Sequence, residues 1–456
     1  MKIIKKQNSE ERREMILNGN ILHTLLFLSI PTLMVGIIQA LIPLSDGLFL
    51  NNLAGVLVAS SVSFSQPVLN IMLALSQGLG VAAMSMIGHL YGRGIMRAVR
   101  EMTLQIFVFS FLIGMALIPI CIILAFWISE FTTPEIRYYV FTYISLYSLV
   151  MPLVFLASIY NASKNAIGRP EITFIRIMIL LVLKVIFNTI FLYIFRMGIV
   201  GAVMATLFSY ITITIWMFHD LFIKKSEFKL DLRTYHMKFP IIKKLISLGF
   251  PSMISYMLIY LGFFLINKEV EKYGAVSLNG QGIASNINSI CFILPSSIGT
   301  TVTTMISMNL GIGNIKKSKT IFNYGWITST IIAIISIIAI LPFSEFFTHM
   351  FTREPQVIDI AIKALNIYTY SVISFGIFSV CQGVFIALGR TRITMVMSIL
   401  RIWFLRYLFI LITKSYLGLY AVFWGNLFSN TVAAVIFFIL TIRIDWNKNY
   451  VKRELK

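Results

Sequence analysis

Charged side chains are scarce in this chain, and their scarcity excludes a large class of proteins. Only 12% of the 456 residues are Asp, Glu, Lys or Arg, whereas soluble domains carry about 25%. Hydrophobic residues make up 58%, and the mean hydropathy is +0.86. The composition excludes a soluble enzyme and predicts a helical membrane protein with many spans.

Cysteine is scarce as well, and several catalytic signatures are missing from the sequence. Cys121, Cys291 and Cys381 each lie in an apolar run without the spacing of metal ligands, so neither a disulfide framework nor a zinc site is expected. A P-loop ending in Gly-Lys-Ser/Thr is absent, which excludes ATP hydrolysis by that route. The loops also lack the clustered Asp residues that a membrane-embedded transferase would need. We expect a protein that is not an enzyme and that uses no metal or other cofactor.

Apolar runs long enough to cross a bilayer, which takes about 20 residues, are abundant. Some of them contain a proline, such as Pro152 and Pro251, where membrane helices tolerate kinks. The predicted fold class is an all-α integral membrane protein with twelve transmembrane helices. The twelve runs lie at residues 21–46, 54–89, 101–127, 138–160, 172–195, 199–223, 241–267, 275–309, 320–344, 357–383, 393–413 and 416–442.

Basic residues alternate along the loops between these runs. One set of loops, which includes both tails, holds most of the Lys and Arg side chains. By the positive-inside rule this set is cytoplasmic, so we expect both termini in the cytoplasm and the chain in the cell membrane. The bias also accounts for most of the net charge of +20, so no nucleic-acid partner is expected. The opposite set of loops holds only Arg137, Arg196, Lys268, Lys272, Arg353 and Lys414.

The two halves of the chain repeat one another with an offset of about 220 residues. Because each half has an even number of spans, the repeats are expected to be parallel and related by a pseudo-two-fold axis along the membrane normal. We predict a cytoplasmic tail (1–20), an N-lobe (21–223), a linker (224–245), a C-lobe (246–442) and a second tail (443–456). The matches include Leu28-Ser-Ile-Pro31-Thr with Leu248-Gly-Phe-Pro251-Ser, Phe131-Thr132 with Phe351-Thr352, and Ala166-Ile-Gly168-Arg169 with Ala387-Leu-Gly389-Arg390.

Asp46 is the one acidic residue that the sequence places well inside an apolar run. An ionised carboxylate at bilayer depth costs about 2.5–3.5 kcal/mol on insertion scales, so it needs a partner, water or a proton. Lys184 and Asn188 lie four residues apart in the run 172–195, and they therefore share a helix face. A lysine at this depth needs an anion, and Asp46 is the predicted partner. The alternatives are that Asp46 is hydrated at the membrane edge and that Lys184 snorkels to the interface.

Polar side chains in two corresponding runs are candidates for a substrate cleft. They recur at helical spacing in 54–89 and in 275–309, which are repeat partners, so both polar faces are expected to point at the axis between the lobes. The alternative is hydrogen bonding between helices, worth about 0.6 kcal/mol per bond in membranes. A deep arginine of the run 393–413 is placed with them, although no acid of its own half lies nearby in the sequence. The candidates are Gln66, Asn70, Gln281, Ser285, Asn286 and Arg406.

Several segments, taken in order, give the chain a family resemblance. They are Ile30-Pro31-Thr32, Asp46-Gly-Leu-Phe-Leu-Asn-Asn-Leu-Ala-Gly55, Gly78-Leu-Gly80, Gly88–Gly94, Gly198-Ile-Val-Gly201-Ala-Val-Met-Ala-Thr206, Gly249-Phe-Pro251-Ser252 and Ala387-Leu-Gly389-Arg390. With them the chain resembles the MATE family of multidrug and toxic compound extrusion transporters, and in particular the bacterial type related to the staphylococcal multidrug exporter. The resemblance implies two six-helix lobes around a central cleft, and export driven by an inward flow of protons or sodium.

In prokaryotic members the resemblance implies a coupling site of four residues in the N-lobe. It combines an Asp in the first span, an Asn and an Asp four residues apart in the fifth, and a Thr in the sixth. Asp46 and Thr206 match this pattern, but Lys184 stands where the Asn would be and Asn188 where the Asp would be. The site has lost a carboxylate and gained an ammonium group. Since Na⁺ prefers a cluster of oxygens, this exchange argues against sodium coupling.

The hypothesis is a proton-coupled antiporter that exports amphipathic, cationic compounds and works as a monomer among membrane lipids. Asp46 exchanges the proton, and Lys184 pairs with it in one state and releases it in the other. The alternative is that Lys184 permanently occupies the cation position, so that coupling is weak or lost. Lys184, Arg401 and Arg406 weaken the cationic preference, and they keep open a lipid-linked saccharide flippase of related architecture. A sodium-coupled drug antiporter is the other alternative. A major-facilitator exporter has the same number of spans, but residues 91–97 lack its acidic-basic loop pattern.

Overall fold

The computed structural model describes residues 9–50, 56–132, 134–224 and 227–446, and this part of the chain contains helices and no strand. Ten of the described helices are long and apolar enough to cross a membrane, and two bent helix pairs pass the same test, which gives up to twelve spans. The prediction of an all-α membrane protein is confirmed. Such runs become helices because the hydrocarbon core offers the backbone no water, so each peptide group must find its partner within its own segment.

The chain divides into two compact units, and the divisions fall inside the long helices α2 (Ile21–Phe49) and α9 (Phe239–Glu271). Met34–Tyr256 forms one unit, which we call the N-unit. Met1–Leu33 and Met257–Lys456 form the other, which we call the C-unit. The lobe boundaries drawn from the sequence stay a prediction.

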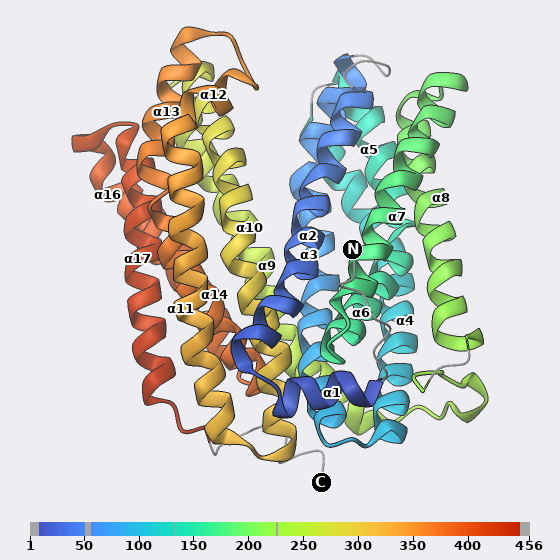
Figure 1. Ribbon diagram of the computed structural model, residues 1–456. Helices are drawn as coiled ribbons and strands as arrows, with labels where there is room; N and C mark the ends of the chain where they lie inside the picture. Colours follow the sequence, from blue (N-terminus) through green and yellow to red (C-terminus); the bar gives the residue numbers. More distant parts are fainter. Residues whose placement is uncertain (1–8, 51–55, 133, 225–226, 447–456) are drawn as a thin grey trace. The chain divides into compact units, whose positions relative to one another are not determined.

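Within the N-unit, α3 packs against α4, α5 and α6, while α7 packs against α8 (Figure 1). Two of its helices end in π-helical turns, η2 (Thr189–Ile194) after α7 and η3 (His219–Ile223) after α8. The α-helices of this unit, besides the adjoining parts of α2 and α9, are α3 (Val56–Gly92), α4 (Met96–Glu130), α5 (Pro134–Ser148), α6 (Met151–Ala166), α7 (Pro170–Asn188) and α8 (Gly198–Phe218).

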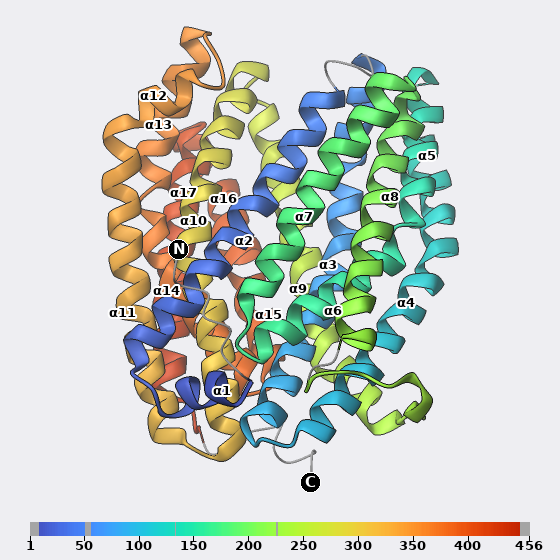
Figure 2. The ribbon, with the colours of Figure 1, turned by 45° about the vertical axis from the view of Figure 1, so that its right-hand side comes forward.

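Within the C-unit, α10 packs against α11, α13 and α14, and α14 packs against α17 (Figure 2). The approach of α10 to α14 is so close that a Cβ at Gly383 would lie 2.5 Å from the carbonyl oxygen of Gly299. The tail helix α1 (Ser9–Asn18) also belongs to this unit, and the Arg12 guanidinium lies 4.8 Å above the Phe27 ring. The remaining helices are α10 (Ala275–Ile312), α11 (Ile315–Ile340), α12 (Ser344–His349), α13 (Pro355–Tyr368), α14 (Ser371–Ala387), α15 (Thr391–Ile399), η6 (Leu400–Tyr407), α16 (Leu408–Leu417) and α17 (Tyr420–Arg443).

The two bent pairs, α5 with α6 and α13 with α14, are each bent by 49°. The first bend lies beside Pro152, as the sequence indicated. The second has no proline. There the hydroxyls of Thr369 and Ser371 donate to the carbonyl oxygens of Leu365 and Tyr368, a kind of bond that also occurs in the unbroken helices α10 and α17.

The cytoplasmic loops predicted from the charge pattern include residues 161–176 and 384–401, and three basic residues of these loops lie buried within helices instead. Lys164 lies in α6, Arg176 in α7 and Arg401 in η6. The hydropathy pattern misplaced them because the helices continue past the apolar runs and the true turns are short. Between α6 and α7 only residues 167–169 remain, where Gly168 makes the turn with φ of 72°. The positive-inside count therefore included buried side chains.

Candidate functional site

Asp46 lies near the end of α2, and its carboxylate is held by two residues of α7. Lys184 makes an ion pair with its Oδ2. Asn188 donates through Nδ2 to its Oδ1 at 3.0 Å. The Lys184 side chain is only 6% exposed and that of Asp46 29%. The structure thus brings these three predicted residues together, and it pairs the deep lysine with the acid named from the sequence.

The spacing on α7 explains this geometry. Residues four apart lie one turn above the other on one helix face, so Lys184 and Asn188 reach the same carboxylate from successive turns. Each carboxylate oxygen therefore has its own donor. Tyr143 and Tyr147 of α5 lie within electrostatic range of Asp46 and complete its polar surroundings.

Thr206, the fourth predicted coupling residue, is buried on α8, and its hydroxyl donates to the Ala202 carbonyl at 3.1 Å. Its described bond therefore stays within its own helix rather than reaching Asp46. Asn51, Asn52 and Gly55, which complete the segment begun by Asp46, lie outside the described residues. The coupling roles of the four predicted residues stay a prediction.

The predicted cleft residues lie on three helices. On α3, Gln66 Nε2 donates to Asn70 Oδ1 at 3.4 Å, so these two bond to each other along one helix face. On α10, Gln281 Nε2 donates to Ser285 Oγ at 3.0 Å. Asn286 is exposed and lines a hollow of about 440 Å³ on the C-unit. These contacts agree with either role, cleft lining or helix contact, so the cleft stays a prediction.

The sixth predicted cleft residue, Arg406, lies buried in η6. Within the C-unit it comes together with Gln281 and Ser285, because all three lie within electrostatic reach of the Tyr368 hydroxyl at the end of α13. The sequence could not show that these residues lie close together, because Tyr368 looks like any other aromatic residue in an apolar run and is fully buried.

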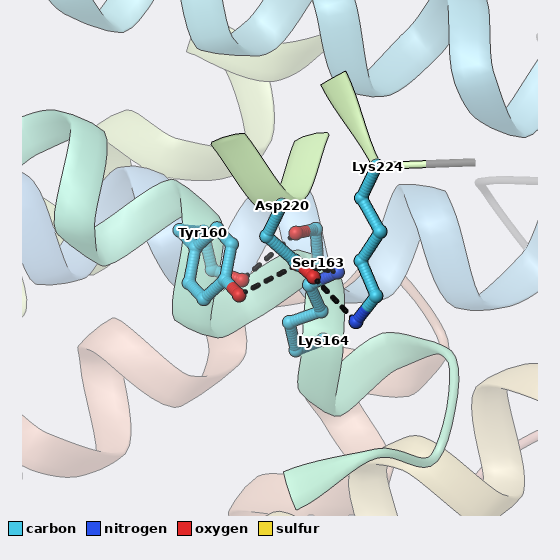
Figure 3. A network of polar contacts seen from close by, with 5 residues as sticks. All are labelled: Tyr160, Ser163, Lys164, Asp220 and Lys224. Carbon is cyan, nitrogen blue, oxygen red and sulfur yellow. Dashed lines mark hydrogen bonds and ion pairs between the residues drawn. The ribbon is translucent and has the colours of Figure 1, made fainter. Parts of the chain in front are cut away.

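A second polar network in the N-unit was missed by sequence reasoning, because Asp220 lies at the end of the span Gly198–Ile223 (Figure 3). Lys164 Nζ makes an ion pair with Asp220 Oδ2 at 2.6 Å, and the Tyr160 hydroxyl donates to the same oxygen at 2.8 Å. Lys224 reaches Oδ1 at 3.4 Å from the exposed side. Lys164 also lies 5.1 Å from the Tyr160 ring centroid and 5.3 Å from that of Phe228. The network joins α6 to η3, which follows α8.

Glu269, at the end of α9, is a further acid that the sequence did not single out. Lys414 of α16 donates to its Oε2 at 3.0 Å and Lys272 to its Oε1 at 2.7 Å. The hydrogen bond to Glu269 raises the pKa of Lys272. Asp220 and Glu269 both lie at the ends of spans. In the described part of the chain, no three His, Cys, Asp or Glu side chains come together as metal ligands would.

Comparison with known proteins decides the family. The MatE family profile matches residues 31–190 and again residues 251–412, so its two copies begin 220 residues apart, the offset of the internal repeat. The chain belongs to the MATE family. This confirms the resemblance drawn from the sequence and makes the chain a member of a family of multidrug efflux transporters with many membrane spans.

Relatives and a solved structure agree with this MATE assignment. A probable multidrug resistance protein of Bacillus subtilis, YpnP, is 23% identical, and the match covers 88% of this chain and 90% of the relative. The multidrug export protein MepA of Staphylococcus saprophyticus is 21% identical over 92% of this chain and 94% of its own. A multidrug resistance MATE transporter in an outward-facing conformation has a TM-score of 0.89 and 21% identity, covering 96% of this chain and 98% of that one. The structural likeness establishes the fold.

Proposed function

We propose that this MATE protein is a secondary active exporter that moves amphipathic compounds out of the cell in exchange for protons, with Asp46 as the coupling carboxylate. The observation that carries the proposal is the ion pair between Asp46, near the end of α2, and the buried Lys184 of the span Pro170–Ile194. The names of the relatives support the substrate class, since YpnP and MepA are named as multidrug resistance and multidrug export proteins.

The pair offers a direct route for a proton to change the contacts of α2 and α7. When Asp46 is ionised, Lys184 and Asn188 hold its two oxygens. When a proton binds one of those oxygens, the carboxyl group becomes neutral and loses its charge attraction to Lys184. The ammonium group is then left without its anion, which is costly at bilayer depth, so the contact between the helices weakens. Release of the proton on the other side restores the pair.

The same contacts favour protons over sodium. Na⁺ is a hard cation that binds through several oxygen ligands. Here both oxygens of Asp46 already accept bonds from protein donors, and the buried Lys184 ammonium stands where a bound cation would have to sit. A proton needs only one carboxylate oxygen. The ion pair can therefore exchange H⁺ without building a coordination shell.

Several finer features of the prediction form part of the proposal. We place the protein in the cell membrane as a monomer with both termini in the cytoplasm. Two lobes that rock around a central cleft would carry the substrate, with Gln66, Asn70, Gln281, Ser285 and Asn286 as cleft residues. A preference for cationic substrates follows from the family resemblance, and the buried basic side chains weaken it.

Efflux from proteoliposomes tests the proposal. The purified protein would be reconstituted with ethidium and given either a proton gradient or a sodium gradient. We expect efflux under the proton gradient alone. Asp46→Asn should lose it, because an amide cannot exchange the proton, whereas Asp359→Asn should retain it. Asp359 is a suitable control because it is an exposed acid paired with Lys363.

Lys184→Asn tests the switch separately. If Lys184 must hold and release Asp46, proton-driven efflux should fall strongly in this variant. Unchanged efflux would show that Lys184 is not part of the switch. Efflux driven by sodium in the wild type would refute proton coupling. Loss of efflux in the Asp359 control as well would point to damage by reconstitution rather than to Asp46.

A further inference from the structure

Two arginines are buried on the same short segment of the C-unit. Arg401 and Arg406 lie in the π-helix η6, and each is only 7% exposed. In an α-helix, residues five apart would point about 140° away from each other. The hydrogen bonds of a π-helix join residues i and i+5, so this winding stacks the two arginines on one face. The two guanidinium groups are close enough to repel each other.

Arg401 has aromatic rings over its guanidinium group and an unused donor at the edge. Its Cζ lies 5.2 Å from the ring centroid of Phe375 and 4.9 Å from that of Phe378, both on α14. Its Nη1 donates to Asn430 Oδ1 at 2.9 Å. Its Nε is buried and has no hydrogen-bond acceptor in the described structure. Since a guanidinium group carries its N–H donors in its own plane, the buried Nε–H remains for an acceptor in that plane.

The side chain of Asn430 is itself held in place by hydrogen bonds, so the site is preorganised. Its Nδ2 donates to Asn426 Oδ1 at 2.6 Å and to the Asn426 carbonyl at 2.8 Å, one turn earlier on α17. The side-chain oxygen is therefore turned toward Arg401. The guanidinium is held by a buried amide and two rings, and its orientation does not depend on a ligand.

Arg406 repeats the arrangement. Its Cζ lies 5.6 Å from the ring centroid of Phe263 on α9, and the Tyr368 hydroxyl, which has no hydrogen-bond partner among the described residues, lies within electrostatic reach. Its Nε is also buried without an acceptor among the described residues. In the same part of the chain, no carboxylate lies within 4 Å of either arginine. The acids Glu269 and Asp359 of the C-unit are engaged with lysines.

The two halves of the repeat differ at the position of Asp46. In the N-unit, Asp46 lies 15 residues after Pro31 and neutralises Lys184. Fifteen residues after Pro251, the corresponding position of the C-unit holds Ile266, which is 1% exposed. Arginine keeps its charge under all ordinary conditions, so the described part of the C-unit buries two permanent cations that have no carboxylate partner. A buried charge without a partner is strongly unfavourable, and an anion from outside the chain would remove that cost.

We infer that Arg401 and Arg406 form a binding site for an organic oxyanion, namely a carboxylate or phosphate group carried on an apolar body. The guanidinium fork matches the paired oxygens of these groups, and its Nε edge is free in both residues. The apolar body is expected because the surrounding side chains are the rings of Phe263, Phe375 and Phe378. The inference that such oxyanions are transported rests on the proposed function. The inference that they bind does not.

Equilibrium binding without any gradient separates the two proposals, because it needs no transport. The probe is 1-naphthylacetate, and 1-naphthylmethylammonium is its counterpart with the same ring and the opposite charge. Titration calorimetry and the thermal melting midpoint would be measured on the full chain in a neutral detergent. We expect the carboxylate to bind and to raise the midpoint, while the amine does neither. Equal binding of both probes, or of neither, would overturn the inference even if ethidium efflux were normal.

Variants locate the site. Arg406→Gln and Arg401→Gln should each weaken 1-naphthylacetate binding about ten- to hundredfold, the range for losing a hydrogen bond to a charged group. Lys363→Gln is the matched control, since it removes an exposed positive charge from the same unit and should bind normally. Because Arg406 has no carboxylate partner among the described residues, its Gln variant should melt no lower than wild type without ligand. If the Arg406→Gln variant does not fold, Arg406→Lys is the variant to measure. Unchanged binding of 1-naphthylacetate by Arg406→Lys would show that the planar guanidinium group is not required and would overturn the inference.

Competition distinguishes the sources of the oxyanion. Dihexanoylphosphatidate carries a phosphate on an apolar body, whereas inorganic phosphate carries none. Displacement of the probe by dihexanoylphosphatidate at much lower concentration than by inorganic phosphate would support the site and indicate that it accepts a lipid phosphate. Displacement by neither would also support it, with carboxylates as the preferred ligands. Equal displacement by both would overturn the requirement for an apolar body.

Discussion

Removing either partner of the buried ion pair between Lys164 and Asp220 should destabilise the N-unit, but by different amounts. Asp220→Asn leaves the Lys164 ammonium, which is 5% exposed, without any carboxylate. Breaking a buried pair in this way costs about 3–5 kcal/mol. Lys164→Met instead leaves Asp220 with the Tyr160 hydroxyl at 2.8 Å and Lys224 at 3.4 Å. An acceptor that keeps other donors should lose only about 1–3 kcal/mol.

Thermal unfolding in detergent with a thiol-reactive dye measures this asymmetry, because Cys121, Cys291 and Cys381 are all free and buried and become reactive only on unfolding. A change of 1 kcal/mol shifts the melting midpoint by about 2–4 °C for a unit of 150–250 residues. Asp220→Asn should therefore lower the midpoint by at least about 6 °C, and by more than Lys164→Met does.

Two further variants complete the test of the pair. The double variant Lys164→Met/Asp220→Asn should lose less than the sum of the two single changes, because the pair can be broken only once. Lys224→Gln is the control, since its side chain is 58% exposed and an exposed ion pair is worth about 0–1 kcal/mol. A larger loss for Lys164→Met than for Asp220→Asn, or strict additivity, would refute the reasoning.

Two other predictions concern the C-unit. Gly383→Ala should cost about 1–3 kcal/mol by overpacking, because the new Cβ would lie 2.5 Å from a backbone carbonyl oxygen of α10. A Cβ at Gly282 would meet nothing within 4 Å. Gly282→Ala should therefore melt like wild type in the thiol-dye assay. The hydrogen bond to Glu269 raises the pKa of Lys272 above 10.5, so the stabilisation is fully present below pH 10.5 and is lost as the pH rises through the raised pKa. We expect the melting midpoint, followed by tryptophan fluorescence, to fall more steeply above pH 10.5 in wild type than in Glu269→Gln, and parallel curves would contradict this.

Most of the fold could be predicted from the sequence because the membrane makes length and hydropathy decisive. Each apolar run became a helix or a bent helix pair, and Pro152 marked one of the two bends. The other bend, at Thr369 and Ser371, could not be foreseen. Serine and threonine hydroxyls bond to the preceding turn in many helices of this chain without bending them, so sequence alone does not show which position bends.

The candidate site could be predicted in part, and there is a physical reason why some of its residues were found and others were missed. Lys184 was informative because a cation in mid-span has few ways to be satisfied, and the structure pairs it with Asp46 as expected. Lys164 and Asp220 gave no such signal, since each lies at the end of an apolar run, where a charge reaching water would look the same. Only the packing of α6 against α8 shows that the two side chains are buried together.

The internal repeat explains why the fold recurs while the chemistry does not. Helix positions depend on apolar periodicity, which both halves share, and the MATE profile matches each half in turn. A charged side chain depends on its individual partner, so a single exchange changes the site while the helices stay in place. Asp46 balances Lys184 in one unit, whereas among the described residues of the other unit no ion pair joins a carboxylate to Arg401 or Arg406. A duplicated scaffold of this kind can therefore carry a proton site in one half and an oxyanion site in the other, and the two can be tested separately by single substitutions.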